Sequence, residues 1–201
     1  MAKDLKPHIG IFGRRNCGKS SLINLLTGQD IAIVSDTAGT TTDPVKKSIE
    51  IFGVGPCVLI DTAGIDDIGE LGQQRVEKTL KVLEEIDCAI LVITGNQFDE
   101  PERKLIHRMK ELAVPFFIVH NKADEEPLLA VMKAVIEQKY DLKILDFSVQ
   151  RKDDIAPVVE MLKRPFLRAP IKRFLYWAAS SSRTRWWYWS APSTLRLPKV
   201  D

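Results

Sequence analysis

Eight residues near the start of the chain, Gly13 to Ser20, have the types and spacing needed to hold a phosphate chain. They read GRRNCGKS and fit the P-loop pattern G-x-x-x-x-G-K-S/T. Glycines let the backbone turn tightly and bring its N–H groups against phosphate oxygens, and the start of the following helix adds a favourable dipole. Lys19 would neutralise the outer phosphates, and the Ser20 hydroxyl would bind Mg²⁺. We therefore predict a nucleoside triphosphate site, which also takes in Cys17, Gly18 and Ser21.

A second group of such residues follows a predicted strand, at Asp61-Thr62-Ala63-Gly64. The carboxylate of Asp61 could hold Mg²⁺ through water, and Gly64 could turn its N–H toward the γ-phosphate. This pattern is weak alone, because aspartate and glycine are common turn residues. Its position behind a P-loop makes it a candidate metal and switch site.

A third run, Asn121-Lys122-Ala123-Asp124, follows a later strand and would select the base. The carboxylate of Asp124 could accept two hydrogen bonds from guanine, from its ring N–H and its exocyclic amine, whereas adenine offers the wrong pattern. Asn121 would tie this loop to the P-loop, and the stem of Lys122 would lie over the base. A last guanine loop is expected at Ser148-Val149, where Val149 replaces the usual small residue. The runs together predict GTP or GDP as the ligand.

A long polar segment, from Gly28 to Pro44, joins the first predicted helix to the second predicted strand. Its centre, residues 37–43, reads TAGTTTD. Its turn formers alone would make it a flexible loop. Given the other motifs, we expect a switch loop in which a threonine reaches Mg²⁺ and the γ-phosphate and is released on hydrolysis.

An alternation of strands and helices must position these runs. Apolar runs predict strands at 8–12, 45–52, 57–60, 87–93, 115–120 and 142–147. Helical spacing predicts helices at 19–27, 72–86, 101–113, 127–139 and 153–163. Several strands are apolar throughout, as expected when helices cover both faces of a sheet. The sequence therefore predicts a three-layer α/β P-loop NTPase fold with a mainly parallel six-stranded sheet, whose ligands bind at the strand ends.

The chain changes character near residue 164. Residues 164–201 carry eight Lys and Arg against one acid, whereas the rest of the chain carries 21 basic and 26 acidic residues. All four tryptophans lie in this last segment, which has no helix or strand period. We therefore predict an N-terminal arm at 1–7, a GTP-binding domain at 8–163 and an irregular tail at 164–201.

Composition also indicates a compartment. The start of the chain has no apolar signal sequence, and no run is long enough to cross a membrane. The three cysteines lie far apart, which predicts reduced thiols and neither a disulfide nor a metal site. We expect a cytoplasmic protein with no membrane partner and, because the GTP-binding part is net acidic, no nucleic-acid partner.

The combined motifs resemble the Era, Der and MnmE group of GTPases, in which switch threonines sit in a G-T-T-x-D context, as at 39–43. Within that group, the runs at 13–21, 28–48, 61–72 and 75–79 resemble HydF, the GTPase involved in maturation of FeFe hydrogenase. The resemblance covers roughly residues 7–163. It implies GTP hydrolysis as a nucleotide switch in hydrogenase maturation, with other maturation proteins as partners.

The resemblance also implies roles for single residues. It makes Thr41 the switch-loop ligand of Mg²⁺, beside Ser20 and Asp61, and makes Lys19, Thr41 and Gly64 the catalytic set. Asn16 lies where related GTPases use an asparagine to bind K⁺ against the phosphates, so we expect K⁺ to stimulate hydrolysis. No glutamine stands beside Gly64 to orient water, so turnover should be slow.

The HydF family carries a dimerisation domain and an iron–sulfur cluster domain after its GTPase domain. This sequence offers no ligands for such a cluster and no counterpart of the dimerisation domain behind the family's homo-oligomers. Two interpretations of the tail stay open. It could be a basic aromatic arm for nucleic acid or an anionic membrane. It could also be translated out of frame. Tryptophan has the single codon TGG, and the codons of residues 186–189, read from one base earlier, encode apolar residues. The HydF family has an apolar strand of this kind at the start of its dimerisation domain.

Two other functions stay open beside hydrogenase maturation. One is an Era- or Der-like GTPase in ribosome or RNA maturation, which the acidic charge of residues 8–163 disfavours. The other is a binding module in which GTP gates partner contacts and turnover is negligible.

Overall fold

The computed structural model describes residues 6–28, 35–37, 45–51, 55–66, 70–151 and 155–168. Its strands are β1 (His8–Gly13), β2 (Ser35–Thr37), β3 (Val45–Ile51), β4 (Gly55–Asp61), β5 (Cys88–Thr94), β6 (Phe116–Asn121) and β7 (Ile144–Asp146). Its helices are α1 (Lys19–Gly28), α2 (Glu70–Val82), α3 (Glu100–Glu111), α4 (Ala130–Tyr140) and α5 (Ile155–Arg168). Strands and helices alternate along the chain as predicted.

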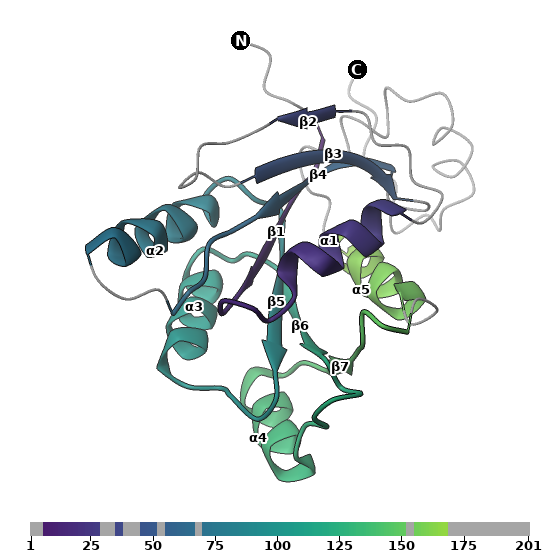
Figure 1. The fold of residues 1–201 in the computed structure, drawn as a ribbon. Helices are drawn as coiled ribbons and strands as arrows, with labels where there is room; N and C mark the ends of the chain where they lie inside the picture. Colours follow the sequence, from purple (N-terminus) through teal and green to yellow (C-terminus); the bar gives the residue numbers. More distant parts are fainter. Residues whose placement is uncertain are drawn as a thin grey trace, which may run out of the picture.

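The strands form one sheet in the order β2-β3-β4-β1-β5-β6-β7 (Figure 1). Strands β4, β1, β5, β6 and β7 are parallel, whereas β3 and β2 run antiparallel to their neighbours. The predicted α/β fold with a mainly parallel sheet is confirmed. The structure adds one short strand, β2, inside the segment predicted to be a switch loop.

The register of the sheet brings the predicted ligand loops to one edge. Ile11 lies beside Asp61, so β1 and β4 end close together. On the other side of β1, Gly13 pairs with Val92 of β5. The last residue of β5, Thr94, pairs with Asn121, the last residue of β6. The carboxyl ends of the parallel strands therefore meet at the same edge, where ligands bind in open α/β sheets.

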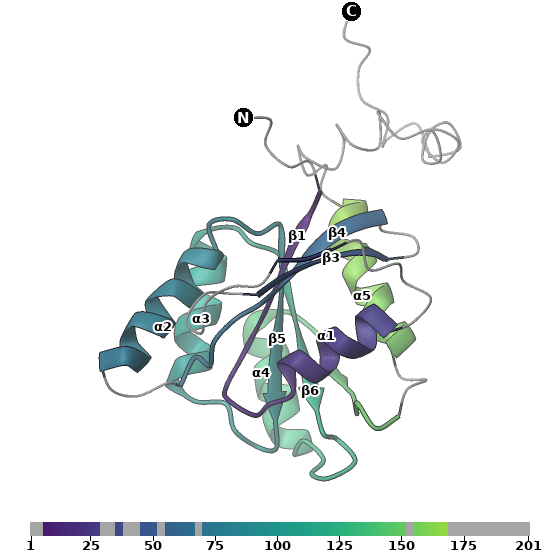
Figure 2. The same ribbon diagram turned by 45° about the horizontal axis from the view of Figure 1, so that its top comes forward.

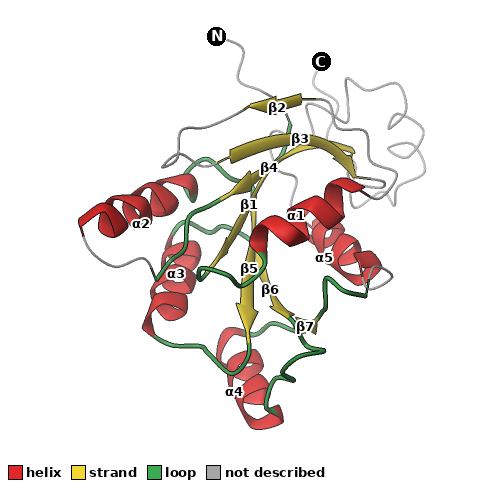
Figure 3. Ribbon diagram, in the orientation of Figure 1, coloured by secondary structure: helices red, strands yellow, loops and turns green. Residues whose placement is uncertain are grey.

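Helices cover both faces of this sheet (Figures 1 and 2). Helices α1 and α5 lie on one face, where Leu22 and Val158 join the core beneath β1, β4 and β5. Helices α2, α3 and α4 lie on the other face and share a second core that includes Leu105 and Ile136. Burial on both faces explains the apolar sequences of β1 and β5. Figure 3 shows the connecting loops that leave the strand ends.

Helix α3 begins at a capping box formed by Asp99 and Glu102. Its N-cap is Asp99, and Pro101 lies in its first turn. The side chain of Glu102 reaches back and accepts the backbone N–H of Asp99 at 2.8 Å. This arrangement satisfies N–H groups that a helix start otherwise leaves without partners.

Helix α5 continues to Arg168, five residues beyond the predicted domain end at 163. Ile155, Val158 and Leu162 are buried at helical spacing and anchor it to the core. The change in charge at 164 is a poor marker of the helix end, because backbone hydrogen bonding does not follow net charge. The rest of the predicted tail and most of the predicted arm lie outside the described residues. In the described part of the chain, no helix combines the length and the apolar character that a membrane span needs.

Candidate nucleotide-binding site

The P-loop joins β1 to α1, as predicted, and two of its glycines are required by close approaches. Gly13 has a φ of +150°, and a Cβ there would lie 2.3 Å from the carbonyl oxygen of Val92 in β5. Gly18 has a φ of +91°, and its Cβ would lie 2.2 Å from the amide nitrogen of Asn121. No other residue type fits at these distances and dihedral angles. The glycines therefore let the loop lie directly against the ends of β5 and β6.

Lys19 lies in the first turn of α1, and only 8% of it is exposed. Its Nζ donates hydrogen bonds to the carbonyl oxygens of Gly13, at 3.1 Å, and Arg14, at 2.7 Å. The ammonium is thus held across the loop by two backbone carbonyls. Phosphate oxygens are stronger acceptors than peptide carbonyls, so this group can exchange partners when a phosphate chain enters the loop.

Ser20 and Asp61 form the metal-type pair that the sequence predicts. The hydroxyl of Ser20 donates to Asp61 Oδ2 at 2.6 Å, which joins the start of α1 to the end of β4. The second oxygen, Asp61 Oδ1, is buried without a hydrogen-bond partner among the described residues. Hydroxyl, carboxylate and water oxygens are the ligands that Mg²⁺ prefers. The donor set therefore fits Mg²⁺, and a bound ion or its water would satisfy the unpaired oxygen.

The loop after Asp61 folds back onto the P-loop. The N–H of Ile65 donates to the carbonyl of Gly13 at 3.3 Å. The side chain of Asp66 accepts the N–H of Arg15 at 2.9 Å. Gly64 lies so close that a Cβ would be 2.6 Å from Arg15 Cγ. The structure thus places the Asp66 carboxylate on the P-loop backbone, a contact that no sequence motif predicts.

Asn121 links the base loop to the P-loop, as expected. Its Nδ2 donates to the carbonyl of Cys17 at 2.9 Å in a buried contact. Its Oδ1 is buried and has no partner among the described residues. Lys122, the next residue, has a φ of +58° and lies at an ion-pair distance of 3.7 Å from Glu125. The side-chain amide of Asn121, buried at the end of β6, thus holds this strand end against the P-loop.

Asp124 and Ser148 also meet. A hydrogen bond from Ser148 holds the pKa of the exposed Asp124 carboxyl below its ordinary value. Ser148 itself is fully buried and accepts the N–H of Gln150 at 3.1 Å. Val149 packs against the core on the α1 and α5 face.

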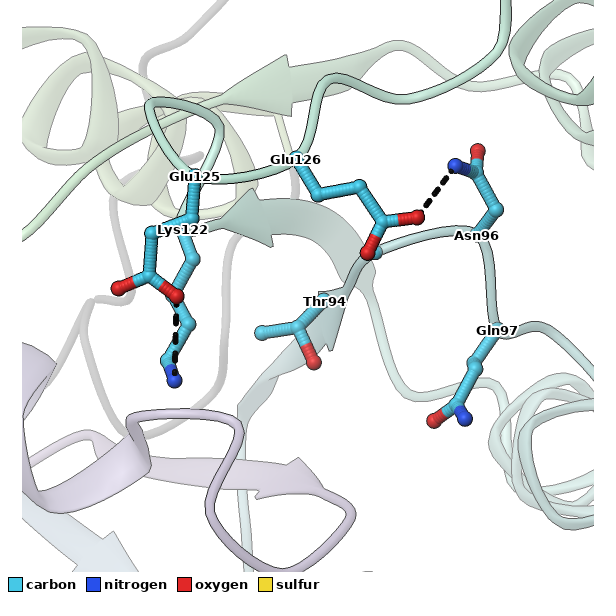
Figure 4. Close-up of a pocket in the computed structure, with 7 residues that line it drawn as sticks. Thr94, Asn96, Gln97, Lys122, Glu125 and Glu126 are labelled. Atoms are coloured by element: carbon cyan, nitrogen blue, oxygen red, sulfur yellow. Dashed lines mark hydrogen bonds and ion pairs between the residues drawn. The ribbon is translucent and has the colours of Figure 1, made fainter.

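A cavity of about 420 Å³ opens beside Lys122 (Figure 4). Polar residues from the ends of β5 and β6 line it, and Asn96 donates to Glu126 at 2.9 Å across its rim. Lys122 and Glu125 form its second rim. The residues at 94–97 that line this cavity lie at or just after the end of β5 and belong to none of the predicted motifs.

Arg14 occupies a variable position of the P-loop and was not among the predicted site residues. Its Nε donates to Glu102 Oε1 at 2.7 Å, and one terminal nitrogen lies 2.9 Å from Asp99 Oδ2. The hydrogen bond with Glu102 holds the pKa of Arg14 above its already high ordinary value. The D-x-x-E spacing of the capping box could have placed the start of α3 from the sequence. Nothing local to Arg14 names its partners, which lie 85 and 88 residues away.

The remaining predicted site residues are Asn16, Cys17, Ser21 and Thr41. Asn16 is exposed at the tip of the P-loop, with a φ of +58°. Cys17 is buried, which raises the pKa of its thiol, and it offers its carbonyl to the site. Ser21 is exposed in the first turn of α1. Thr41 and the centre of the predicted switch loop lie outside the described residues.

Comparison with known proteins agrees with this geometry. Residues 8–122, more than half of the chain, match a family described as "50S ribosome-binding GTPase". GTPase Der of Campylobacter hominis is 41% identical over 147 residues, which are 73% of this chain and 30% of Der. The tRNA modification GTPase MnmE of Aliarcobacter butzleri is 30% identical over 159 residues, 77% of this chain and 33% of MnmE. The chain thus spans about a third of the length of these relatives.

A solved structure of Era extends the likeness to the fold. It holds MgGDPNP and nucleotides 1506–1542 of 16S ribosomal RNA. The likeness has a TM-score of 0.64 and 26% identity and covers 79% of this chain and 56% of Era. The motifs, their meeting at one sheet edge and the match over residues 8–122 all indicate the same family. The chain belongs to the family described as "50S ribosome-binding GTPase", and Der, MnmE and Era are among its relatives.

Proposed function

We propose that this chain binds GTP and hydrolyses it with Mg²⁺, and that the two nucleotide states make it a switch. One observation carries the proposal: the phosphate loop, the metal-type pair and the base loop meet at one edge of the sheet. Ser20 lies against Asp61, and Asn121 lies against the P-loop at Cys17. These contacts join segments up to 104 residues apart in the sequence.

Each end of a GTP molecule has a matching group. Lys19 and the N–H groups at the start of α1 would take the phosphates. The ionised carboxylate of Asp124 would accept the two N–H donors of guanine. Ser20 and Asp61 would hold Mg²⁺, with Thr41 as the predicted further ligand, and Mg²⁺ when bound supplies positive charge that neutralises the phosphates.

Hydrolysis should be slow and should depend on the monovalent cation. Ala63 and Ile65 flank Gly64, so no glutamine stands there to orient water. Asn16 is exposed at the tip of the P-loop, where its amide oxygen is available to K⁺. Phosphate release should be faster in K⁺ than in Na⁺ buffer, and Asn16→Ala should remove the difference. Equal rates of the unmodified protein in the two buffers would refute the K⁺ site alone.

For the whole protein, we favour a role in ribosome or RNA maturation. MnmE is named for tRNA modification, and the Era structure holds ribosomal RNA. The role in hydrogenase maturation rests on the HydF resemblance, and none of the relatives compared above carries that name. Ribosomal subunits and tRNA should be retained by the protein with a non-hydrolysable GTP analogue more than with GDP. Equal retention in both states would count against an RNA-linked switch.

Base selection gives the sharpest test of the nucleotide site. GTP should displace a fluorescent GDP analogue, and ATP should not. Asp124→Asn should lower GTP affinity and raise affinity for xanthosine triphosphate, because an amide can donate to the second xanthine carbonyl. Asp141→Asn is the matched control, since Asp141 is exposed at the left-handed C-cap of α4, which tolerates asparagine. Displacement by ATP as strong as by GTP would overturn the proposed function.

A further inference from the structure

Arg14 ties the P-loop to the start of α3 through a nearly enclosed carboxylate. Its Nε donates to Glu102 Oε1 at 2.7 Å and its Nη2 to Glu102 Oε2 at 3.0 Å, a two-bond fork. The Glu102 side chain is only 1% exposed, and that of Arg14 is 21% exposed. Bidentate arginine–carboxylate pairs fix geometry as well as charge, and enclosure protects this one from screening by salt.

The same carboxylate also starts the helix. Glu102 Oε2 accepts the N–H of Asp99 at 2.8 Å, so one side chain holds both the first turn of α3 and the P-loop. Asp99 adds a more exposed contact of its own, with Oδ2 at 2.9 Å from the guanidinium. The guanidinium therefore cannot shift without disturbing the helix cap.

The backbone of Arg14 meets the phosphate-binding group. Its carbonyl oxygen accepts Lys19 Nζ at 2.7 Å, and the neighbouring carbonyl of Gly13 accepts it at 3.1 Å. Arg14 is thus fixed at its side-chain end by α3 and holds Lys19 at its backbone end. The position of the ammonium depends on where the Gly13–Arg14 peptide lies.

We propose that Arg14 is a positioning residue for nucleotide binding: anchored by Glu102 at the start of α3, it sets the P-loop backbone that holds Lys19. The inference rests on the proposed function, in that GTP phosphates enter this loop. Arg14 need not touch the nucleotide. Its effect is to reduce the ordering that the loop must undergo on binding, which strengthens affinity without new contacts.

Two variants separate this role from folding. Arg14→Gln removes the fork. Glu102→Gln removes the charge but keeps an N3 residue that serves a capping box, so α3 should still start normally. Each variant should weaken GTP binding by about tenfold and change kcat by less than about twofold, since the loss is in binding and not in the reaction step. The double variant should be no weaker than Arg14→Gln alone, because both changes break one interaction.

The matched control lies on the same helix. Arg108→Gln breaks exposed ion pairs with Glu111 and Glu84 and should leave GTP affinity unchanged. Affinity is measured by displacement of a fluorescent GDP analogue, turnover by phosphate release, and folding by the melting temperature, all on the full chain. Both variants break a largely buried ion pair, so their melting temperatures should fall, and affinity is therefore measured at a temperature at which each variant is folded. A loss of affinity of the folded protein supports positioning, since a purely structural role would lower the melting temperature and leave the affinity of the folded fraction unchanged.

Lys19→Ala distinguishes the two ways to fail. If Lys19→Ala still binds GTP like the unmodified protein, the proposed function itself is wrong. If Lys19→Ala loses GTP while Arg14→Gln and Glu102→Gln bind it normally, the positioning role alone is overturned. Additive losses in the double variant would also overturn it, because the two residues would then act separately.

Discussion

The buried link between the base loop and the P-loop should be measurable as stability, independently of nucleotide. Asn121→Ala removes the Nδ2 that donates to the carbonyl of Cys17 at 2.9 Å. A buried hydrogen bond contributes about 0.5–1.5 kcal/mol net, and a buried carbonyl left without its donor costs about 1–3 kcal/mol. The truncation also removes Oδ1, which has no partner to lose among the described residues. Because the truncation leaves the buried carbonyl without its donor, the second figure applies, and we expect the free energy of unfolding to fall by about 2 kcal/mol.

The assay is thermal unfolding followed by circular dichroism in nucleotide-free buffer. For a chain of this size, about 2 kcal/mol corresponds to a melting temperature lower by about 4–8 °C. Asn96→Ala is the matched control, because it deletes the same side chain where its bonds to Glu126 and to the N–H of Leu129 are solvent-exposed. That control should cost about 0.5 kcal/mol. A melting temperature for Asn121→Ala no lower than for Asn96→Ala would refute the reasoning.

Three further predictions concern buried polar groups and thiols. Ser148→Ala removes the hydrogen bond that lowers the pKa of Asp124, so that pKa should rise toward its ordinary value. GTP affinity, measured from about pH 7 to about pH 4.5, should then be lost at a higher pH than in the unmodified protein. Coincident pH profiles of the two proteins would contradict this. Thr62→Val removes the hydrogen bond of 2.7 Å from the Thr62 hydroxyl to the carbonyl oxygen of Ile11 in β1. The free energy of unfolding, measured in urea, should fall by about 1–2 kcal/mol. No change would show that the carbonyl finds another donor. Burial raises the pKa values of Cys57 and Cys88 to about 12, so the folded state keeps thiol protons that the unfolded state releases above about pH 9. Urea stability should therefore fall as pH rises from about 9 toward 12, and less steeply in a Cys57→Ala/Cys88→Ala variant; equal slopes would refute it.

The parts of the site that could be predicted are those whose chemistry is local. The P-loop and the Asn121–Asp124 run can be identified from the sequence alone, because binding a phosphate chain or a base edge needs certain residue types within a few positions. The contact between Asn121 and the P-loop followed from the order of the motifs. The edge at which the loops meet followed from the alternation of strands and helices, since parallel strands end together.

The parts that could not be predicted depend on distant packing. Arg14 and Glu102 meet only because β1 and β5 are neighbours, and the variable P-loop positions carry no pattern. Strand β2, Ser35–Thr37, is three residues long inside a segment of turn formers, so it has too few positions for a period. Helix α5 ends at Arg168 and not at the predicted residue 163, because the apolar spacing that predicts it ends with Leu162, whereas the helical backbone continues.

All three cysteines are buried, which gives the protein an experimental handle. A cysteine introduced at an exposed position would be the one thiol that a maleimide dye reaches in the folded protein. Gln97 is suitable, because it is exposed at the rim of the cavity that Lys122 also lines (Figure 4). A dye at that position would sit next to the base loop without removal of any native cysteine. Nucleotide exchange could then be followed in real time with unmodified GTP.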